Sequence, residues 1–344
     1  MVAANSTLPA RSYVAVLKAK QGELLAVQTT APESFVPLLE LSGADKVAAV
    51  CRAWPHTDHV VWVHPLNVTG IDEAEWARHV EQMLTELHAA HLAAVPVVTS
   101  NEDTVILEVV RAAVSRDGRG LVIRLDCEDA LETGSEGLGA EIGDVLSACR
   151  VHPSDCDLVI DAALVDGGPA VQASVVSTVL ASIPDIDDWR SIVVAFSAFP
   201  ESVGDIVARE SVGSIPRIDA ASFAQLLRTW NGRGLTYADY GVGVPTYADV
   251  PFAPIPNIRY ALDDEWRIHR ARERRNPSPQ YVSLARDLTA ASYFAGAAFS
   301  PGDAYIADVA SGSDGPGNAM TYLRAAMSRH FHVVLASLAS RGVP

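Results

Sequence analysis

Eight short apolar segments recur along the first 240 residues, and segments with helical character separate them. The apolar segments are residues 13–20, 34–41, 59–64, 94–99, 120–126, 157–162, 191–197 and 235–240. Short apolar strands that alternate with helices are typical of parallel βαβ units. Eight such units predict an α/β fold, a closed (β/α)8 barrel like a TIM barrel. An open doubly wound parallel sheet is the alternative, but residues 20–23 lack its glycine-rich turn.

The chain continues for about a hundred residues after the eighth segment. Prolines 251, 254 and 256 mark a loop, and residues 257–262 and 265–270 flank Asp263-Asp264 as a predicted hairpin. Helices are expected near residues 283–298 and 319–340. We therefore expect a barrel in residues 1–250 and a hairpin with a helical extension in residues 251–344, packed together as one structural unit.

The charge balance limits the partners of the chain. The sequence has 26 basic and 42 acidic residues, a formal charge of −16, which repels nucleic acid at long range. Residues 1–11 lack the apolar core of a signal peptide, and no run of about 18 apolar residues occurs. The four cysteines form no Cys-x-x-Cys pair. We expect reduced thiols, no membrane contact and a cytoplasmic location.

Polar residues lie at the carboxyl ends of several predicted strands, where barrel enzymes place their active sites. Side-chain alternation assigns the following residues to this mouth: Lys18, Lys20, Glu40, His64, Arg124, Asp126, Asp161, Ser197 and Asp239. Such a ring of charges can bind an anionic or zwitterionic ligand. It can also neutralise itself through pairs such as Lys18 with Glu40 or Arg124 with Asp161.

The candidate catalytic residues are Lys18, Lys20, Glu40, Asp161 and Asp239. A lysine at this place can form a Schiff base, but it more often holds a phosphate or carboxylate as a point charge. Anion binding is favoured because a second lysine and Arg124 keep the site cationic. The carboxylates could hold Mg²⁺, although no Asp-x-Asp signature assigns metal ligands. His64 is typical of a packed histidine, and Ser197 lacks the Gly-x-Ser-x-Gly setting of a nucleophile.

The predicted hairpin is rich in arginine. The basic residues are Arg259, Arg267, Arg270, Arg272, Arg274 and Arg275, and the aromatic ones are Tyr260, Trp266 and His269. Arginines that alternate with aromatic residues can hold phosphate and stack on bases. The alternative is a solvated hairpin whose arginines pair with neighbouring acidic residues.

Four segments together resemble the "beta protein" family of phage and bacterial proteins. They are residues 13–23 with Lys-x-Lys-x-Gly-Glu, residues 36–40, residues 239–241 and residues 257–266 with Asn-Ile-Arg-Tyr. The resemblance implies a TIM-barrel-like fold and phage-related gene neighbourhoods, with no settled activity. The matching positions are Lys18, Lys20, Gly22, Glu23, Glu40, Arg217, Asp239, Tyr240, Arg259 and Tyr260. Ala15 stands where many relatives have proline.

Three functional hypotheses follow. In the first, the mouth binds a nucleotide or phosphate-like anion within a phage-defence system, and its ligand-binding residues are Glu23, Arg124, Asp126, Arg217, Tyr240, Arg259 and Tyr260. In the second, the chain is a non-catalytic adaptor whose arginine-rich hairpin binds nucleic acid or a partner protein from the same operon. In the third, the acidic residues support metal-assisted hydrolysis. No motif assigns a reaction or a cofactor.

Overall fold

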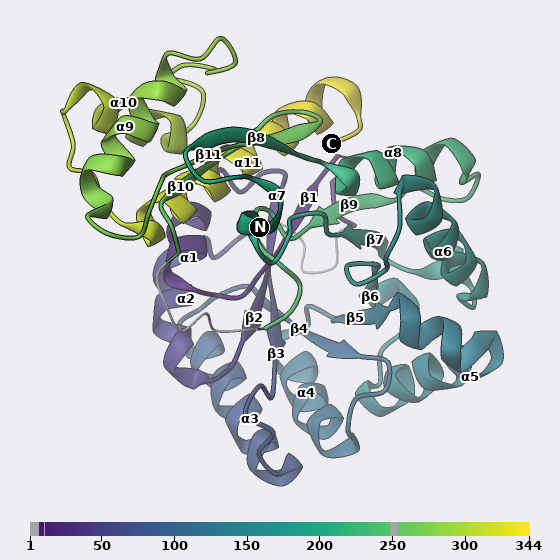
Figure 1. Ribbon diagram of the computed structural model, residues 1–344. Coiled ribbons are helices and arrows are strands. Elements are labelled where there is room, and N and C mark those ends of the chain that lie inside the picture. The colour runs from purple at the N-terminus through teal and green to yellow at the C-terminus, as the bar shows by residue number, and fades with distance from the viewer. Residues whose placement is uncertain (1–6, 10, 248–253) are drawn as a thin grey trace.

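The computed structural model describes residues 7–9, 11–247 and 254–344. Eight parallel strands close into a barrel in the order β1-β2-β3-β4-β5-β6-β7-β9 (Figure 1). Their bounds are β1 (Tyr13–Leu17), β2 (Phe35–Leu41), β3 (Val61–Pro65), β4 (Ala94–Thr99), β5 (Leu121–Asp126), β6 (Cys156–Asp161), β7 (Ser191–Phe196) and β9 (Thr236–Asp239). The predicted (β/α)8 barrel is confirmed, and the open sheet is excluded.

Helices surround the barrel and connect its strands. They are α1 (Gln21–Val27), α2 (Val47–Ala53), α3 (Glu73–Ala89), α4 (Thr104–Asp117), α5 (Cys127–Cys149), α6 (Pro169–Ser182), the short α7 (Val203–Ile206) and α8 (Ile218–Thr229). Three 3-10 turns add η1 (Ala44–Lys46), η2 (Pro153–Asp155) and η3 (Ile186–Asp188). Helix α3 shows why such segments are helical: the Asp72 carboxylate caps its first turn, and its apolar stripe is buried.

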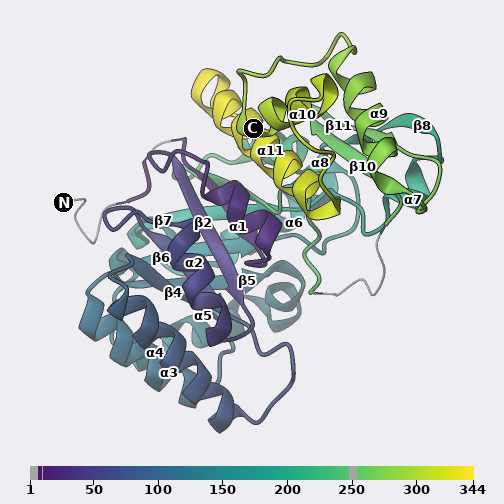
Figure 2. The same ribbon diagram turned by 90° about the vertical axis from the view of Figure 1, so that its left-hand side faces the viewer.

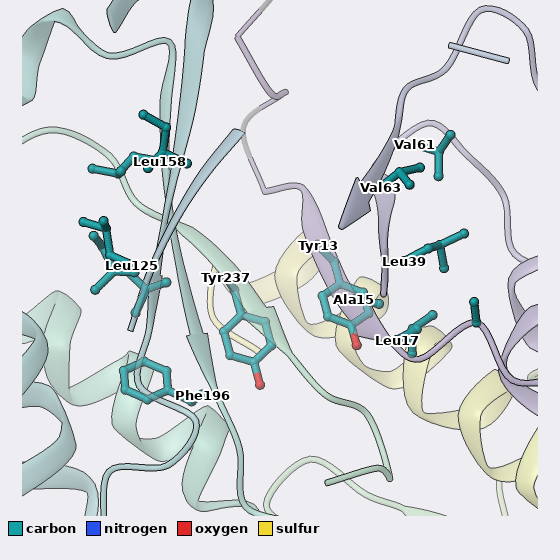
Figure 3. Packing of buried hydrophobic residues seen from close by; sticks show 14 of the residues in the cluster. Tyr13, Ala15, Leu17, Leu39, Val61, Val63, Leu125, Leu158, Phe196 and Tyr237 are labelled. Atoms are coloured by element: carbon teal, nitrogen blue, oxygen red, sulfur yellow. The ribbon is translucent and has the colours of Figure 1, made fainter. Parts of the chain in front are cut away.

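Side-chain alternation along the strands creates two apolar layers. Val14, Val36 and Val122 belong to the layer inside the barrel. Leu125 and Leu158 belong to the layer between the strands and the helices, where Figure 3 shows them. Because both faces of each barrel strand are covered, the strands are nearly continuous apolar runs, as expected for a buried parallel sheet.

The C-terminal region forms a second sheet and the last helices. Strand β11 (Glu265–Arg270) pairs with β10 (Asn257–Ala261), which confirms the predicted hairpin, and also with β8 (Ser211–Pro216). Three helices follow: α9 (Pro277–Thr289), α10 (Pro301–Ser311) and α11 (Ala319–Arg341). Strand β8 and helix α10 were not expected from the sequence, and α9 ends earlier than predicted. Pro251 and most of residues 1–11 lie outside the described residues.

Helix α11 joins the two regions. It packs against α1, β1 and β10, so it stands between the first barrel strand and the second sheet (Figures 1 and 2). Phe331 on this helix is fully buried in the outer apolar layer of the barrel. The last helix thus takes the place of the eighth helix of a (β/α)8 ring, although residues 240–318 separate it from the eighth barrel strand.

Candidate functional site

Arg124 is the centre of the barrel mouth. It points inward from β5 and donates to Glu40 Oε1, at 2.8 Å, and to Asp161 Oδ2, at 2.8 Å. Its third nitrogen lies 2.6 Å from the hydroxyl of Tyr240, and Nη1 lies 2.9 Å from Nδ1 of His64. We call these five residues the Arg124 cluster. Four barrel strands and the residue after β9 bring them together, as side-chain alternation predicted for four of them.

The charged side chains of the Arg124 cluster pair with one another. Burial lowers the pKa of Arg124, but Tyr240, Asp161 and Glu40 more than offset this and hold it well above its usual value. Burial raises the pKa of Glu40, and Arg124 opposes that rise. Burial and the Arg124 charge hold the pKa of His64 well below its usual value, so its ring is neutral at pH 7 and Nδ1 accepts a hydrogen bond. One cation thus lies between two carboxylates.

Lys18 anchors the loop that follows β9. Its ammonium donates to the carbonyl oxygen of Val244, at 2.6 Å, and to that of Thr246. The side chain is nearly buried, and burial lowers the pKa of its amine. Among the described residues, no carboxylate forms an ion pair with Lys18 within 4.0 Å, so the expected pair with Glu40 does not form. Lys18 therefore fixes residues 241–247 across the mouth.

Glu23 and Lys20 form the start of α1. Glu23 Oε2 accepts the backbone N–H of Lys20 at 3.1 Å, which closes a capping box. Burial raises the pKa of Glu23 to about 7, although the Lys20 amide and Lys18 oppose it. The ammonium groups of Lys18 and Lys20 lie 5.9 and 5.2 Å from the ring centre of Tyr247. The two predicted lysines therefore share an aromatic neighbour that the sequence did not single out.

A groove of about 740 Å³ opens beside Lys20, between α1 and α2. We call it the lysine groove; its lining includes Lys20, Ser42, Asp45, Lys46, Arg52 and Tyr247. Asp45 is the single carboxylate that the described residues contribute to this lining, and it pairs with Lys46 at 3.1 Å. The described lining residues thus include three cationic side chains and one carboxylate, in a chain whose formal charge is −16.

The lysines of the chain gather at this place. The sequence has 23 arginines and three lysines, which are Lys18, Lys20 and Lys46. Two of them line the groove, and the third lies near Tyr247 at its edge. Sequence reasoning identified Lys18 and Lys20 from the end of the first strand but missed Lys46. The scarcity of lysine elsewhere was the signal that could have found it.

Asp239 does not face the mouth, so this prediction is wrong. Ala238 and Tyr240 point into the barrel, which turns Asp239 outward toward α11. Its carboxylate accepts hydrogen bonds from the hydroxyls of Tyr13 and Tyr237 and lies 2.8 Å from Nε2 of His330. Figure 3 shows the two tyrosine rings beside each other. The small Ala238 suits the barrel interior better than a carboxylate.

Arg217 also lies outside the mouth. It is buried at the start of α8, where Nη2 donates to Asp219 Oδ2 at 2.9 Å and lies 3.6 Å from Asp239. Asp219, Asp239 and Tyr237 hold its pKa well above the usual value despite burial. The expectation that Arg217 binds an anion at the mouth is therefore contradicted by its position. Glu40 and Asp161 contact Arg124 and Asp239 faces away, so the carboxylates expected to share a metal ion do not converge.

The other residues predicted to bind a ligand lie partly at the barrel mouth and partly in the C-terminal extension. Asp126 caps α5 by accepting the backbone N–H groups of Glu128 and Asp129. Arg259 donates to the Val242 carbonyl oxygen at 2.7 Å, and burial lowers its pKa to about 10. Tyr260 instead bonds Asp303 in the core of the extension and does not reach the mouth.

The arginine-rich hairpin does not present the predicted stacking surface. Trp266, Tyr260 and His269 are buried, because they face the cores on either side of the second sheet. Arg267 pairs with Glu265 at 2.5 Å, and Arg270 donates to the Val207 carbonyl. The exposed arginines follow the hairpin, at Arg272, Arg274 and Arg275. Base stacking by these aromatic residues is therefore contradicted.

Two further findings concern metal ions and membranes. No group of three or more His, Cys, Asp or Glu side chains among them could hold a metal ion. No described helix is long and apolar enough to cross a membrane.

Comparison with known proteins places the chain in a family. No curated protein matches it. Among solved structures, it is similar to a fructose-bisphosphate aldolase from Plasmodium falciparum, with 9% identity and a TM-score of 0.40 over 70% of this chain and 82% of that one. It is also similar to a xylose isomerase-like TIM barrel/4-hydroxyphenylpyruvate dioxygenase fusion protein, with 14% identity and a TM-score of 0.31 over 71% and 40% of the two chains. A family model described as Beta protein matches residues 13–336, so the chain belongs to the Beta protein family.

Proposed function

We propose that the protein binds a small anionic ligand, of the nucleotide or phosphate class, in the lysine groove beside the barrel mouth. The observation that carries this proposal is the lining of the groove, in which Lys20, Lys46 and Arg52 face one carboxylate. Lysine holds phosphate as a point charge, and arginine can hold it through two parallel hydrogen bonds. All three lysines of the chain lie at this end of β1.

The size and the other lining groups suit such a ligand. A groove of about 740 Å³ falls within the ~300–1,000 Å³ of small-molecule sites. Ser42 and Gln28 add hydrogen-bonding side chains, and Tyr247 adds an aromatic ring. Lys18 acts indirectly in this proposal, because its ammonium holds the loop that carries Tyr247. The Arg124 cluster holds the side chain of Tyr240, the residue before this loop, and is assigned no chemical step.

Isothermal titration with ATP, pyrophosphate and inorganic phosphate tests this function. We expect saturable binding that weakens as ionic strength rises, since ion pairs at an open groove are screened by salt. Replacing Lys20 and Lys46 with methionine removes two of the three cations in the groove and should weaken binding at least tenfold. That estimate follows from ~1.5–3 kcal/mol for each hydrogen bond to a charged group.

A matched control removes two exposed cations elsewhere. The variant with Arg272→Met and Arg275→Met changes the net charge of the protein by the same amount but lies outside the groove. It should bind each probe as tightly as the wild type. If both double variants weaken binding equally, the effect comes from the net charge of the protein and not from the groove. If the wild-type protein binds none of the probes, the proposal is contradicted.

We further propose that this binding serves a phage-defence system, which rests on the family resemblance to phage and bacterial proteins. A host that carries the gene with its neighbouring genes should form fewer phage plaques than a host with an empty vector. The double lysine variant should lose that protection while it accumulates to the same level. Unchanged plaque numbers with the intact genes across a phage panel would count against this role.

A second candidate function is docking of a partner protein, and the free edge of β8 favours it. Among the described residues, this strand is bonded to β11 on one side and to no strand on the other. Val212 on β8 and Ile206 on α7 are about half exposed. An edge strand with apolar neighbours can take up an added strand from a partner. Replacing Val212 with lysine should abolish co-purification with such a partner and leave nucleotide binding unchanged; undiminished recovery of the partner would exclude this surface.

A further inference from the structure

A second cavity, of about 260 Å³, lies at the end of the barrel opposite the mouth. Its lining comes from the starts of several barrel strands and from the segment before β1. We call it the lower cavity and define it by Leu8, Val36, Trp62, Val95, Arg119 and Arg190. Barrel interiors are normally filled by layers of side chains. The space beneath those layers is large enough for a small molecule.

The inner wall of the lower cavity is apolar. Val36, Trp62 and Val95 belong to the apolar layer inside the barrel, and Leu8 packs against the same layer. The surface of a bound molecule would therefore be largely removed from water here. Each Å² of apolar surface buried in this way is worth about 25 cal/mol. The wall favours a ligand with an apolar body.

Two buried donors in this lining have no acceptor among the described residues. The side chain of Trp62 is fully buried, and its Nε1–H forms no hydrogen bond with them. Arg119 Nη1 also lacks a hydrogen bond with the described residues, but the Arg119 side chain is 24% exposed and forms a long ion pair with Asp117 Oδ2, at 3.9 Å. An unsatisfied buried donor costs about 1–3 kcal/mol. Within the part of the chain that the structure describes, neither group is hydrogen-bonded to an oxygen acceptor.

The carboxylate inside the lining is already occupied. Asp157 accepts Arg190 Nε at 3.0 Å and Nη2 at 2.7 Å, and it also accepts the hydroxyl of Ser191. Glu33 and Asp58 line the rim, where both are exposed to solvent. The one carboxylate among the described interior side chains is thus already paired, whereas the Trp62 donor is not. A ligand that carries only donor groups would not fit this pattern.

We propose that the lower cavity is a binding site for a small apolar molecule with a carbonyl or carboxylate oxygen. Its oxygen accepts from Trp62 Nε1–H or Arg119, and its apolar body lies against Val36 and Val95. The cavity of about 260 Å³ is larger than the ~150 Å³ apolar cavity that accepts benzene, so a one-ring compound suits its size. This site is separate from the lysine groove and does not depend on the function proposed there.

Nuclear magnetic resonance of the tryptophan side chains tests the proposal on the intact protein. The probes are phenylacetate and phenylacetamide, with toluene as the analogue that has no acceptor. We expect at least one of the two oxygen-bearing probes to shift the Trp62 indole N–H resonance saturably, with at least tenfold higher affinity than toluene. Assignment of that resonance uses Trp62→Phe, which keeps an aromatic ring and removes the donor.

Variants separate the contributions of the two donors. Trp62→Phe should weaken binding of the oxygen-bearing probe about tenfold, and Arg119→Gln should weaken phenylacetate more than phenylacetamide. Trp230→Phe is the control, because the Trp230 Nε1–H donates to the Arg233 carbonyl outside the cavity. A wild-type Trp62 resonance that moves with none of the probes would overturn the proposal. Equal affinity for toluene would overturn the role of the oxygen.

Discussion

At the scale of the residue, Arg124 contributes to the stability of the folded protein by pairing with the buried carboxylates at the barrel mouth. It is the cation that both Glu40 and Asp161 contact, and all three side chains are largely buried. Removing one partner from a buried ion pair costs about 3–5 kcal/mol, because charge is left without compensation. We expect Arg124→Met to lower the free energy of unfolding by that amount, as measured by urea denaturation. A loss below about 1 kcal/mol would show that the cluster contributes little.

Glu23 predicts a specific pH dependence. Its pKa in the folded protein is about 7, above the value of about 4.3 for an exposed glutamate. The folded state therefore favours the neutral acid, which adds stability at low pH that is lost as pH rises from about 4.3 through 7. That difference is worth about 4 kcal/mol at most.

The test is a comparison of Glu23→Gln with the wild type across this range. The variant keeps an oxygen acceptor for the Lys20 amide but cannot ionise. Urea denaturation should show the wild type losing stability relative to Glu23→Gln between pH 5 and pH 8. Glu273→Gln, at an exposed position, should run parallel to the wild type. Parallel curves for Glu23→Gln as well would show that its carboxyl titrates normally.

The residues that sequence reasoning placed correctly share one property. Glu40, Arg124 and Asp161 each follow an unbroken apolar run, so alternation fixed the face on which they lie. The prediction for Asp239 was wrong because both faces of its short strand end in polar residues, Asp239 and Tyr240. Alternation alone could not tell which of the two points into the barrel, and packing places Tyr240 there. Side-chain alternation could not predict that Lys46 lies near Lys20, because their proximity depends on how α2 packs beside α1.

At the scale of the element, the loop of residues 241–247 begins with a glycine whose backbone geometry is special. Gly241 has a φ of 61°, and a Cβ atom placed on it would lie 2.6 Å from Sδ of Met327 on α11. Left-handed backbone and this contact both oppose a side chain. Gly241→Ala should therefore lower the free energy of unfolding by about 1–3 kcal/mol.

Gly143 is the matched control for that substitution. It lies within α5, with helical backbone and no atom within 4 Å of an added Cβ. Gly143→Ala should raise the free energy of unfolding by about 0.5–1 kcal/mol, because alanine favours a helix. Thermal or urea denaturation measures both variants. A stabilising Gly241→Ala would contradict the described geometry of the loop.

The elements that sequence reasoning missed have weak local signals. Strand β8 contains Gly213 and Pro216, and its pairing with β11 comes from a segment about fifty residues later. Glycine and proline are both unfavourable in strands, so tertiary pairing overrides the local preference. Helix α10 begins with Pro301-Gly302, a pair that is typical of a turn. In the structure the Ser300 side chain caps the first turn of this helix. The barrel strands were predictable because their apolar runs are continuous.

At the scale of the whole molecule, α11 makes the stability of the barrel depend on the C-terminal region. The ring of Phe331 lies 5.0 Å from that of Phe35 and 6.0 Å from that of Tyr13, between centroids. Truncating a buried phenylalanine costs about 3–5 kcal/mol. Phe331→Ala should therefore destabilise the protein by that amount, and the barrel and the second sheet should unfold in one transition.

Urea denaturation followed by two probes measures this cooperativity. Circular dichroism reports the whole molecule, and fluorescence of a variant that retains Trp266 as its single tryptophan reports the second sheet. Coincident transitions are expected. Leu164→Ala, at a half-exposed site, is the control and should change stability by less than about 0.5 kcal/mol. Separate transitions would show that the C-terminal region and the barrel fold independently.

The most direct test of the anion-binding groove is acylation of the three lysine amines, measured by mass spectrometry with and without ATP or pyrophosphate. We predict that a saturating probe lowers the modification rates of Lys20 and Lys46 several-fold. Lys18, whose amine is nearly buried and bonded to two carbonyl oxygens, should react slowly in both conditions. Unchanged rates at Lys20 and Lys46 in the presence of both probes would contradict the account.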